Sequence, residues 1–299
     1  MKLFFIFLIN IFLLFSLNLN ASNDFVYTQS GVVEGLKKNR SVLYQDIPYA
    51  QPPVGNLRWK APRTLKSSDK ILPKDENFCI QRPSNLGGAE GDDFYAGSED
   101  CLYLDIYTPS KVKNDLPVMF WIHGGGNTSG LKDLYDFSKM VSKHDVIVVA
   151  INYRLGPMGW FTHPAIQEFQ DGDDKTSNFG TLDIIHALKW VNNNISKFGG
   201  NPDNVTIFGE SAGGHNVLSL LVSDKAKGLF HKAISMSGYT TSISTIDAYN
   251  PTQWSSTSNH SSYRIVERLL KSNKEYDDIK FNDHDKLRDV LLNIPIDEF

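Results

Sequence analysis

The sequence predicts an α/β fold with a mostly parallel central sheet and helices on both of its faces. Two near-continuous apolar runs rich in Val and Ile, at 116–126 and 145–154, are typical of strands buried on both sides, as parallel strands under helices are. Farther along, helical and strand segments alternate, and this order favours right-handed connections in an open sheet. The chain has 299 residues, of which 41% are hydrophobic, so it can bury the core that such a fold requires.

The segments that precede these runs predict the near edge of the sheet. Residues 31–55 alternate short apolar stretches with turn residues and end close to a Pro-Pro pair, which favours a small antiparallel edge. Residues 101–109, with the sequence CLYLDIYTP, alternate at period two and stop at a proline. We therefore expect the core strands to begin at this second segment.

The second half of the core is predicted as a helix at 181–200, a strand at 204–208, a helix at 212–222 and a strand at 231–238. The first helix has apolar residues three and four positions apart, on one face: Leu182, Ile185, Leu188, Val191 and Ile195. Gly199 and Gly200 are expected to end it. Beyond Ser237 the chain is rich in Ser, Thr and Asn and then has helical patches, which we interpret as an excursion over the sheet rather than a new domain.

The first residues have the layout of a secretory signal peptide. Lys2 is followed by an apolar run to about Leu17 and by a polar stretch that ends in Ala21, the expected cleavage point. The run is short for a bilayer crossing of roughly 20 apolar residues, and an uncleaved anchor is the alternative. We therefore predict a signal peptide at 1–21, a domain at 22–299 without a membrane span, and secretion or residence in the secretory pathway.

Export predicts a disulfide between the two cysteines and allows glycosylation of five N-x-Ser/Thr sequons. An oxidising compartment favours a disulfide between Cys79 and Cys101, and two unpaired buried thiols are the alternative. The N-x-Ser/Thr tripeptides are expected to be glycosylated in part, at Asn39, Asn127, Asn194, Asn204 and Asn259. Asn127 is the least suited, because it follows a glycine loop that chemistry would keep uncrowded.

Residues 209–213 fit the pattern G-x-S-x-G, with a predicted strand before them and a predicted helix after them. In this context the serine, Ser211, sits on a strained turn that presents its hydroxyl above the sheet. The turn brings backbone so close to its neighbours that only glycine fits two residues before and two after the serine. We predict Ser211 as a nucleophile; a glycine-rich turn that binds phosphate or only packs is the alternative.

The second catalytic motif is HGGG at 123–126, directly after the strand at 116–122. Acyl transfer passes through an oxyanion, which backbone N–H groups aimed in advance can stabilise. We predict these donors to be Gly125 and Gly126 together with Ala212, whose amide starts a helix and gains from its positive end. His123, at the end of a buried strand, is interpreted as structural.

Composition and motifs together exclude several partners. The formal net charge is -4, so no basic field is available to bind nucleic acid. Two cysteines are too few for a structural zinc site. The chemistry that the two motifs indicate needs no metal and no cofactor.

These motifs belong to a longer resemblance. From residue 25 to 299 the chain resembles the type-B carboxylesterase and cholinesterase family of α/β-hydrolases, through DIPYAQPPVGNLRWKAP, SEDCLYLDIYTP, WIHGGG, NYRLGPMGW and FGGNPDNVTIFGESAGG. The resemblance implies an α/β-hydrolase fold, small-molecule carboxylic esters as substrates, and Ser211 as the nucleophile. It also implies a first disulfide and two buried structural ion pairs: Cys79 with Cys101, Arg58 with Glu99, and Arg154 with Asp183.

Two departures from the family's pattern matter. Choline-hydrolysing members hold a quaternary ammonium with a tryptophan in the first disulfide loop, whereas the aromatic residues of this loop are Phe94 and Tyr95, so choline esters are not supported. In the family the triad acid follows the next core strand and the histidine lies much further on, after the last strand, and the residues after Ser211 resemble the stretch before the acid. Four histidines are not expected to replace that base: His215, His231, His260 and His284.

We therefore expect a fragment or truncated product of a longer secreted serine esterase, in which the last two family strands are missing and 231–238 is an uncovered edge. One alternative is a non-catalytic adhesion or structural protein of the same fold. Another is a small lipase-like enzyme complete in itself. For Glu210, beside the nucleophile, tuning of the site's field and a purely structural role both stay open.

Overall fold

The computed structural model describes residues 25–85, 87–91, 94–111, 113–250, 261–296 and 299. The predicted signal peptide at 1–21, Asn259 and His260 lie outside these residues. Within the described ranges, no helix combines the length and apolar character needed to cross a membrane.

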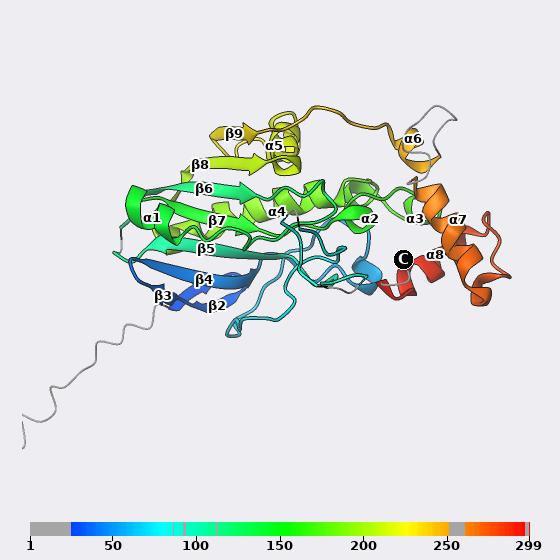
Figure 1. The fold of residues 1–299 in the computed structure, drawn as a ribbon, viewed down its shortest axis with the longest axis horizontal. Helices are drawn as coiled ribbons and strands as arrows, with labels where there is room; N and C mark the ends of the chain where they lie inside the picture. The colour runs from blue at the N-terminus through cyan, green and yellow to red at the C-terminus, as the bar shows by residue number, and fades with distance from the viewer. Residues whose placement is uncertain (1–24, 86, 92–93, 112, 251–260, 297–298) are drawn as a thin grey trace, which may run out of the picture.

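A seven-stranded sheet forms the centre of the molecule, in the order β3-β4-β5-β7-β6-β8-β9 (Figure 1). Its strands are β3 (Leu36–Lys38), β4 (Ser41–Pro48), β5 (Tyr103–Pro109), β6 (Leu116–Ile122), β7 (Ile147–Ile151), β8 (Gly200–Glu210) and β9 (Lys232–Met236). The neighbours from β3 to β7 pair antiparallel, and β7, β6, β8 and β9 pair parallel. β1 (Phe25–Thr28) and β2 (Gly31–Glu34) form a separate antiparallel pair. The predicted antiparallel edge and parallel core are both confirmed.

Helices cover both faces of the sheet because its strands are apolar on both sides. Phe120 of β6 is fully buried in the larger core cluster, beside residues of α4 (Phe179–Asn194) and α5 (Ala212–Leu221). The next residue, Trp121, packs in a second cluster with Val141 of α1 (Ser138–His144). Successive side chains of a strand point to opposite faces, so one strand supports both layers.

Helix α4 follows the predicted stripe closely. Ile185, Leu188 and Val191 are each no more than 2% exposed, and the chain tightens into a 3₁₀ turn at η3 (Ile195–Phe198). Gly199, with φ 85°, ends that turn in the left-handed region that glycine adopts without strain. The predicted helix and its glycine stop are thus confirmed, with the last turn wound more tightly than an α-helix.

One predicted glycosylation site is wrong. Asn194 is 1% exposed, and its amide nitrogen donates to the Trp190 carbonyl at 2.9 Å inside the core. A glycan on that nitrogen has no room in this fold. Asn39 by contrast is exposed, in the turn between β3 and β4.

The remaining elements are short. They are α2 (Gly156–Gly159), α3 (Pro164–Gln167), α6 (Thr245–Tyr249), α7 (Ser262–Ser272), α8 (His284–Asn293) and the 3₁₀ turns η1 (Gly55–Leu57), η2 (Gly172–Asp174), η4 (Asp224–Ala226) and η6 (Lys274–Tyr276). In Figure 1, α6, α7 and α8 lie at the end of the molecule toward which β6 and β8 point. Leu269 of α7 and Leu291 of α8 share a cluster with Trp59 and Phe161, so these helices pack on the earlier part of the chain.

Candidate active site

Ser211 occupies the sharp turn between β8 and α5. Its backbone has φ 57° and ψ -119°, a combination that residues with a side chain rarely adopt. Two backbone hydrogen bonds hold it there, from Ser211 N to the Met236 carbonyl and from His215 N to the Ser211 carbonyl, each 2.9 Å long. The predicted strained turn at Ser211 is confirmed.

The glycines on either side of the serine are sterically required. A Cβ atom at Gly209 would lie 2.6 Å from the Gly213 carbonyl, and one at Gly213 would lie 2.1 Å from the Ile122 oxygen. Both contacts are far shorter than a carbon atom tolerates against backbone. The prediction that only glycine fits at these two positions is therefore confirmed.

The glycine loop after β6 runs against this turn. A Cβ at Gly124 would lie 2.7 Å from the Glu210 carbonyl oxygen and 3.3 Å from the Ser211 Cβ. Gly125 and Gly126 follow with φ 94° and 65°, and the Gly125 carbonyl accepts hydrogen bonds from the N–H groups of Thr128 and Ser129 at 3.0 Å. The structure thus brings the loop and the serine together.

Ala212 and Glu210 flank the serine in opposite environments. Ala212 is fully buried as the first residue of α5, so its amide lies at the positive end of a ten-residue helix. Glu210 is exposed and lines a pocket of about 170 Å³ together with His123, Gly124 and Gly125. Its carboxylate lies beside the glycine loop, with Oε2 3.3 Å from the position of a Cβ at Gly124.

His123 is enclosed at the root of that loop. It is 1% exposed, its ring stacks on Tyr153 at 4.4 Å, and Nδ1 lies 2.9 Å from the Gly124 carbonyl, which can only accept a hydrogen bond. Burial lowers the pKa of His123 to about 4, so the ring is neutral at physiological pH. These contacts agree with the structural role expected for it.

No histidine ring in the described ranges hydrogen-bonds to the Ser211 side chain. His215 stacks on Tyr239 and places Nδ1 2.6 Å from the Tyr239 carbonyl. His231, directly before β9, accepts a hydrogen bond at Nδ1 from the Val205 N–H. His284 Nδ1 lies 2.6 Å from Glu168 Oε2. Each of these rings is thus engaged by a partner other than the serine.

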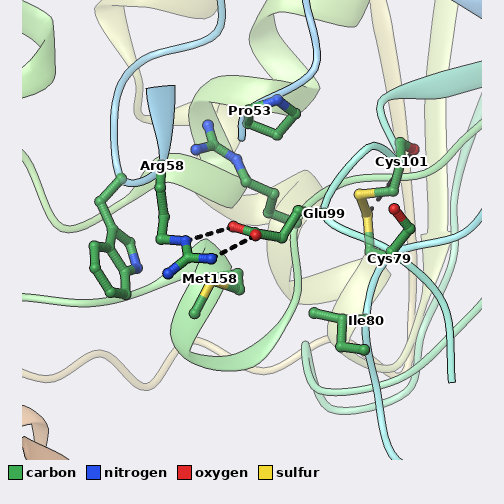
Figure 2. A pocket seen from close by; sticks show the side chains of 10 residues that line it. Pro53, Arg58, Cys79, Ile80, Glu99, Cys101 and Met158 are labelled. Atoms are coloured by element: carbon green, nitrogen blue, oxygen red, sulfur yellow. Dashed lines mark hydrogen bonds and ion pairs between the residues drawn. A yellow bond between two sulfur atoms is a disulfide. The ribbon is translucent and has the colours of Figure 1, made fainter. Parts of the chain in front are cut away.

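The predicted disulfide and both predicted ion pairs are present in the structure. Figure 2 shows the bidentate pair of Arg58 and Glu99 in one pocket with the disulfide of Cys79 and Cys101. Arg58 also donates to the carbonyls of Leu291 and Ile294, at 2.8 and 3.0 Å. The second predicted pair joins Arg154 to Asp183 at 2.6 Å, with both side chains buried. The disulfide and both ion pairs are confirmed.

A second buried charge cluster, around Lys132, is not among the features predicted from the sequence. Lys132, in the loop after the glycines, is fully buried, and its Nζ lies 2.9 Å from Asp105 and 3.0 Å from Asp46. Asp105 is the available signal, because it is a charged residue within the otherwise apolar strand β5. Its partners come from segments that are not adjacent in sequence, so the pattern alone does not reveal them.

Comparisons with known proteins agree with this geometry. A model of the Carboxylesterase family matches residues 22–284. The chain is 45% identical over 221 residues to para-nitrobenzyl esterase of Bacillus subtilis. The alignment covers 73% of this chain and 44% of that protein. The chain is 45% identical over 203 residues to human cocaine esterase, covering 64% of this chain and 35% of that protein. The chain therefore spans less than half the length of these two relatives.

Solved structures give the same result for the fold. A thermophilic PNB esterase superposes with a TM-score of 0.73 and 35% sequence identity, over 93% of this chain and 52% of that one. The Geobacillus stearothermophilus carboxylesterase EST55 superposes with a TM-score of 0.69 and 32% identity, over 92% of this chain and 52% of that one. The predicted α/β-hydrolase fold is confirmed.

Proposed function

This chain belongs to the carboxylesterase family, and we propose that it carries the nucleophile of a secreted serine esterase that cleaves small-molecule carboxylic esters. The observation that carries the proposal is the backbone of Ser211, held at φ 57° between β8 and α5 and directly against the glycine loop. Such strain persists where a surrounding structure enforces it, and it exposes a serine hydroxyl at the end of a sheet.

In the proposed reaction, Ser211 Oγ attacks the ester carbonyl carbon and its proton passes to a general base. The carbonyl oxygen becomes an oxyanion, which accepts hydrogen bonds from the N–H groups of Gly125, Gly126 and Ala212. One such donor typically lowers the barrier by roughly 3 kcal/mol. Collapse of this intermediate releases the alcohol and leaves an acyl group on Ser211, which water then hydrolyses. None of the described histidine rings hydrogen-bonds to the Ser211 side chain, so none of them is assigned as the base.

The proposed substrates are carboxylic esters without a choline group. Relatives named para-nitrobenzyl esterase and cocaine esterase support ester hydrolysis. In the disulfide loop, the ring of Phe94 already faces the Arg82 guanidinium at 4.4 Å, and Tyr95 lies 5.5 Å from the same group. Rings that face a resident cation are poorly placed to bind a quaternary ammonium.

We further propose export through cleavage of residues 1–21. The disulfide between Cys79 and Cys101 supports an oxidising compartment, because such bonds are rare in the cytosol. Among the sequons, the exposed Asn39 is the best glycosylation site, and the half-buried Asn204 is a second candidate. Treatment of the secreted protein with a glycosidase that converts glycosylated Asn to Asp, followed by peptide mass analysis, is expected to mark Asn39 and not Asn194.

The nucleophile is tested with a fluorophosphonate probe and an ester assay on the full-length protein. We expect one covalent adduct, on the peptide that contains Ser211, and loss of both labelling and turnover in Ser211→Ala. Ser219→Ala, on the same helix, is the matched control and should label like the wild type. Labelling that persists in Ser211→Ala would overturn the assignment. A folded protein that neither labels nor hydrolyses esters would favour the adhesion alternative.

A further inference from the structure

Asn127, the residue after Gly126, forms hydrogen bonds with Gly156, Asn216 and Tyr153. Its backbone has φ 59°, and its carbonyl accepts a hydrogen bond of 2.7 Å from the Gly156 N–H. Its side-chain oxygen Oδ1 accepts a hydrogen bond of 2.9 Å from Asn216 Nδ2 and lies 3.3 Å from the Tyr153 hydroxyl. Asparagine is among the few residues that adopt a positive φ at low cost, so it suits this position.

Asn216 provides the contact from the nucleophile side. It lies on α5, just over one turn after Ser211, and is 2% exposed. A buried amide nitrogen of this kind needs an acceptor, and Asn127 Oδ1 supplies it. Within the described part of the chain, this is the only hydrogen bond between residues 123–130 and α5.

Tyr153 fixes the same loop from the third side. Its hydroxyl donates to the His123 carbonyl at 2.7 Å, with Asn127 Oδ1 as a second acceptor. Burial raises the pKa of Tyr153, so the hydroxyl keeps its proton and stays a donor. The loop is thus held at its first residue and again directly after its last glycine.

These contacts matter because strand pairing does not tie the loop to Ser211. The last residues that pair β6 with β8 are Ile122 and Gly209, so this pairing ends before the glycine loop and before the serine. The distance between the loop amides and Ser211 therefore depends on contacts made after the strands end. An oxyanion hole is effective only when its donors are held in place before the reaction.

We propose that Asn127 and Asn216 are positioning residues, which lock the oxyanion loop to the nucleophile helix through their side-chain hydrogen bond. The inference rests on the proposed function of Ser211 and extends it to residues that do not touch the substrate. It also assigns the Asn127 side chain to the site, although its tripeptide fits a glycosylation sequon.

The test measures ester hydrolysis by full-length Asn127→Ala, Asn216→Ala and the double variant. We expect each single variant to lower kcat about tenfold with KM nearly unchanged, because the donors act on the transition state. The double variant should be no slower than the slower single variant, since each single variant already breaks the hydrogen bond between Asn216 and Asn127. Affinity for a trifluoromethyl ketone, which forms an oxyanion adduct with an active-site serine, should fall by a similar factor.

Asn194→Ala is the matched control for a purely structural effect. Asn194 is as buried as Asn216, and its substitution removes side-chain hydrogen bonds to the Trp190 carbonyl and the Gln29 N–H at the end of α4. It should lower the urea midpoint while kcat and ketone affinity stay at the wild-type values. Decreases in kcat that multiply in the double variant, or that match those of Asn194→Ala, would overturn the proposal.

The roles of Ser211 and of the asparagine pair are tested separately. Turnover that survives Ser211→Ala would remove the proposed nucleophile, whatever the asparagine variants show. Turnover that is abolished in Ser211→Ala but unchanged in both asparagine variants would leave the nucleophile in place and remove only the positioning pair.

Discussion

Single residues hold the turn at Ser211 in a conformation that its own backbone disfavours. The positive φ of Ser211 is strained for a residue with a side chain. Gly209 and Gly213 lack the Cβ atoms that would clash with nearby backbone. The N–H of the serine is tied to Met236 of β9, so a neighbouring strand helps to maintain the turn. Strain of this kind makes the site sensitive to very small substitutions.

Gly213→Ala is expected to destabilise the protein by about 2 kcal/mol or more, because the new Cβ would lie 2.1 Å from the Ile122 carbonyl oxygen. Urea unfolding measures the change. Gly172→Ala is the control: Gly172 also has a positive φ, but its Cβ would meet nothing within 4 Å. It should therefore cost only about 1 kcal/mol of conformational strain. Equal losses in the two variants would contradict the steric explanation.

His123 predicts a pH dependence of stability. Burial lowers its pKa to about 4 in the folded protein, whereas in the unfolded chain it is near 6.5. Between these values the unfolded state binds more protons than the folded state, so stability falls as the pH falls from about 6.5 to 4. For one such group the slope approaches about 1.4 kcal/mol per pH unit.

His123→Phe, which can keep the stacking on Tyr153, should reduce this slope by the equivalent of one proton. Burial also lowers the pKa of His163 and of His186 to about 4, so part of the slope should remain. Unfolding free energies from urea titrations across this pH range measure the effect. An unchanged slope in the variant would show that His123 does not contribute to it.

Among the elements, the Lys132 cluster joins β4, β5 and the loop that follows Gly126. Lys132→Met removes a buried cation from between two buried carboxylates and should cost about 3–5 kcal/mol. Lys113→Met is the matched control, because its ion pair with Asp145 is about half exposed and should contribute less than about 1 kcal/mol. Similar unfolding midpoints for the two variants would be the contrary result.

The sequence predicted the elements that form because of residues close together in the chain. The stripe in α4, the strand runs and the glycines beside Ser211 each follow from backbone geometry or from periodicity within a few residues. The hydrogen bond of Asn127 to Asn216 joins segments far apart in the sequence, and periodicity holds no information about which polar groups meet. The same is true of Lys132 and its two carboxylates.

The error at Asn194 has a different origin. A glycosylation tripeptide reports sequence and not exposure. Asn194 comes three residues after Val191 and directly before Ile195, so it lies on the apolar face that the helix pattern had already defined. At this residue the helix periodicity predicts burial, whereas the sequon predicts an exposed side chain. The structure shows a buried side chain, as the periodicity predicts.

At the scale of the whole molecule, Arg58 connects distant parts of the chain. Its guanidinium pairs with Glu99 near the disulfide and donates to two carbonyls at the end of α8. One buried cation thus joins the segment after β4, the disulfide loop and the C-terminal helices. Residues of α7 and α8 also share an apolar cluster with Trp59, the neighbour of Arg58 in the chain.

The two outer strands of the sheet differ in how well they resist pairing with another molecule. β3 presents Lys37 and Lys38, and charged side chains on an edge discourage further pairing. In the part of the chain that the structure describes, β9 has no strand on its outer side; all five of its residues are exposed, with Ile234 at 45% and Met236 at 38%. An exposed apolar edge of this kind favours self-association.

Ile234→Lys should therefore reduce self-association of the chain of residues 22–299. We expect the mass-averaged molar mass, measured by light scattering over a concentration series, to rise with concentration in the wild type and to stay near the monomer value in the variant. Leu36→Lys on β3 is the control, since Leu36 is similarly exposed at 43% but lies beside two lysines. It should associate like the wild type. If both lysine variants lowered the molar mass equally, added charge rather than the β9 edge would be responsible.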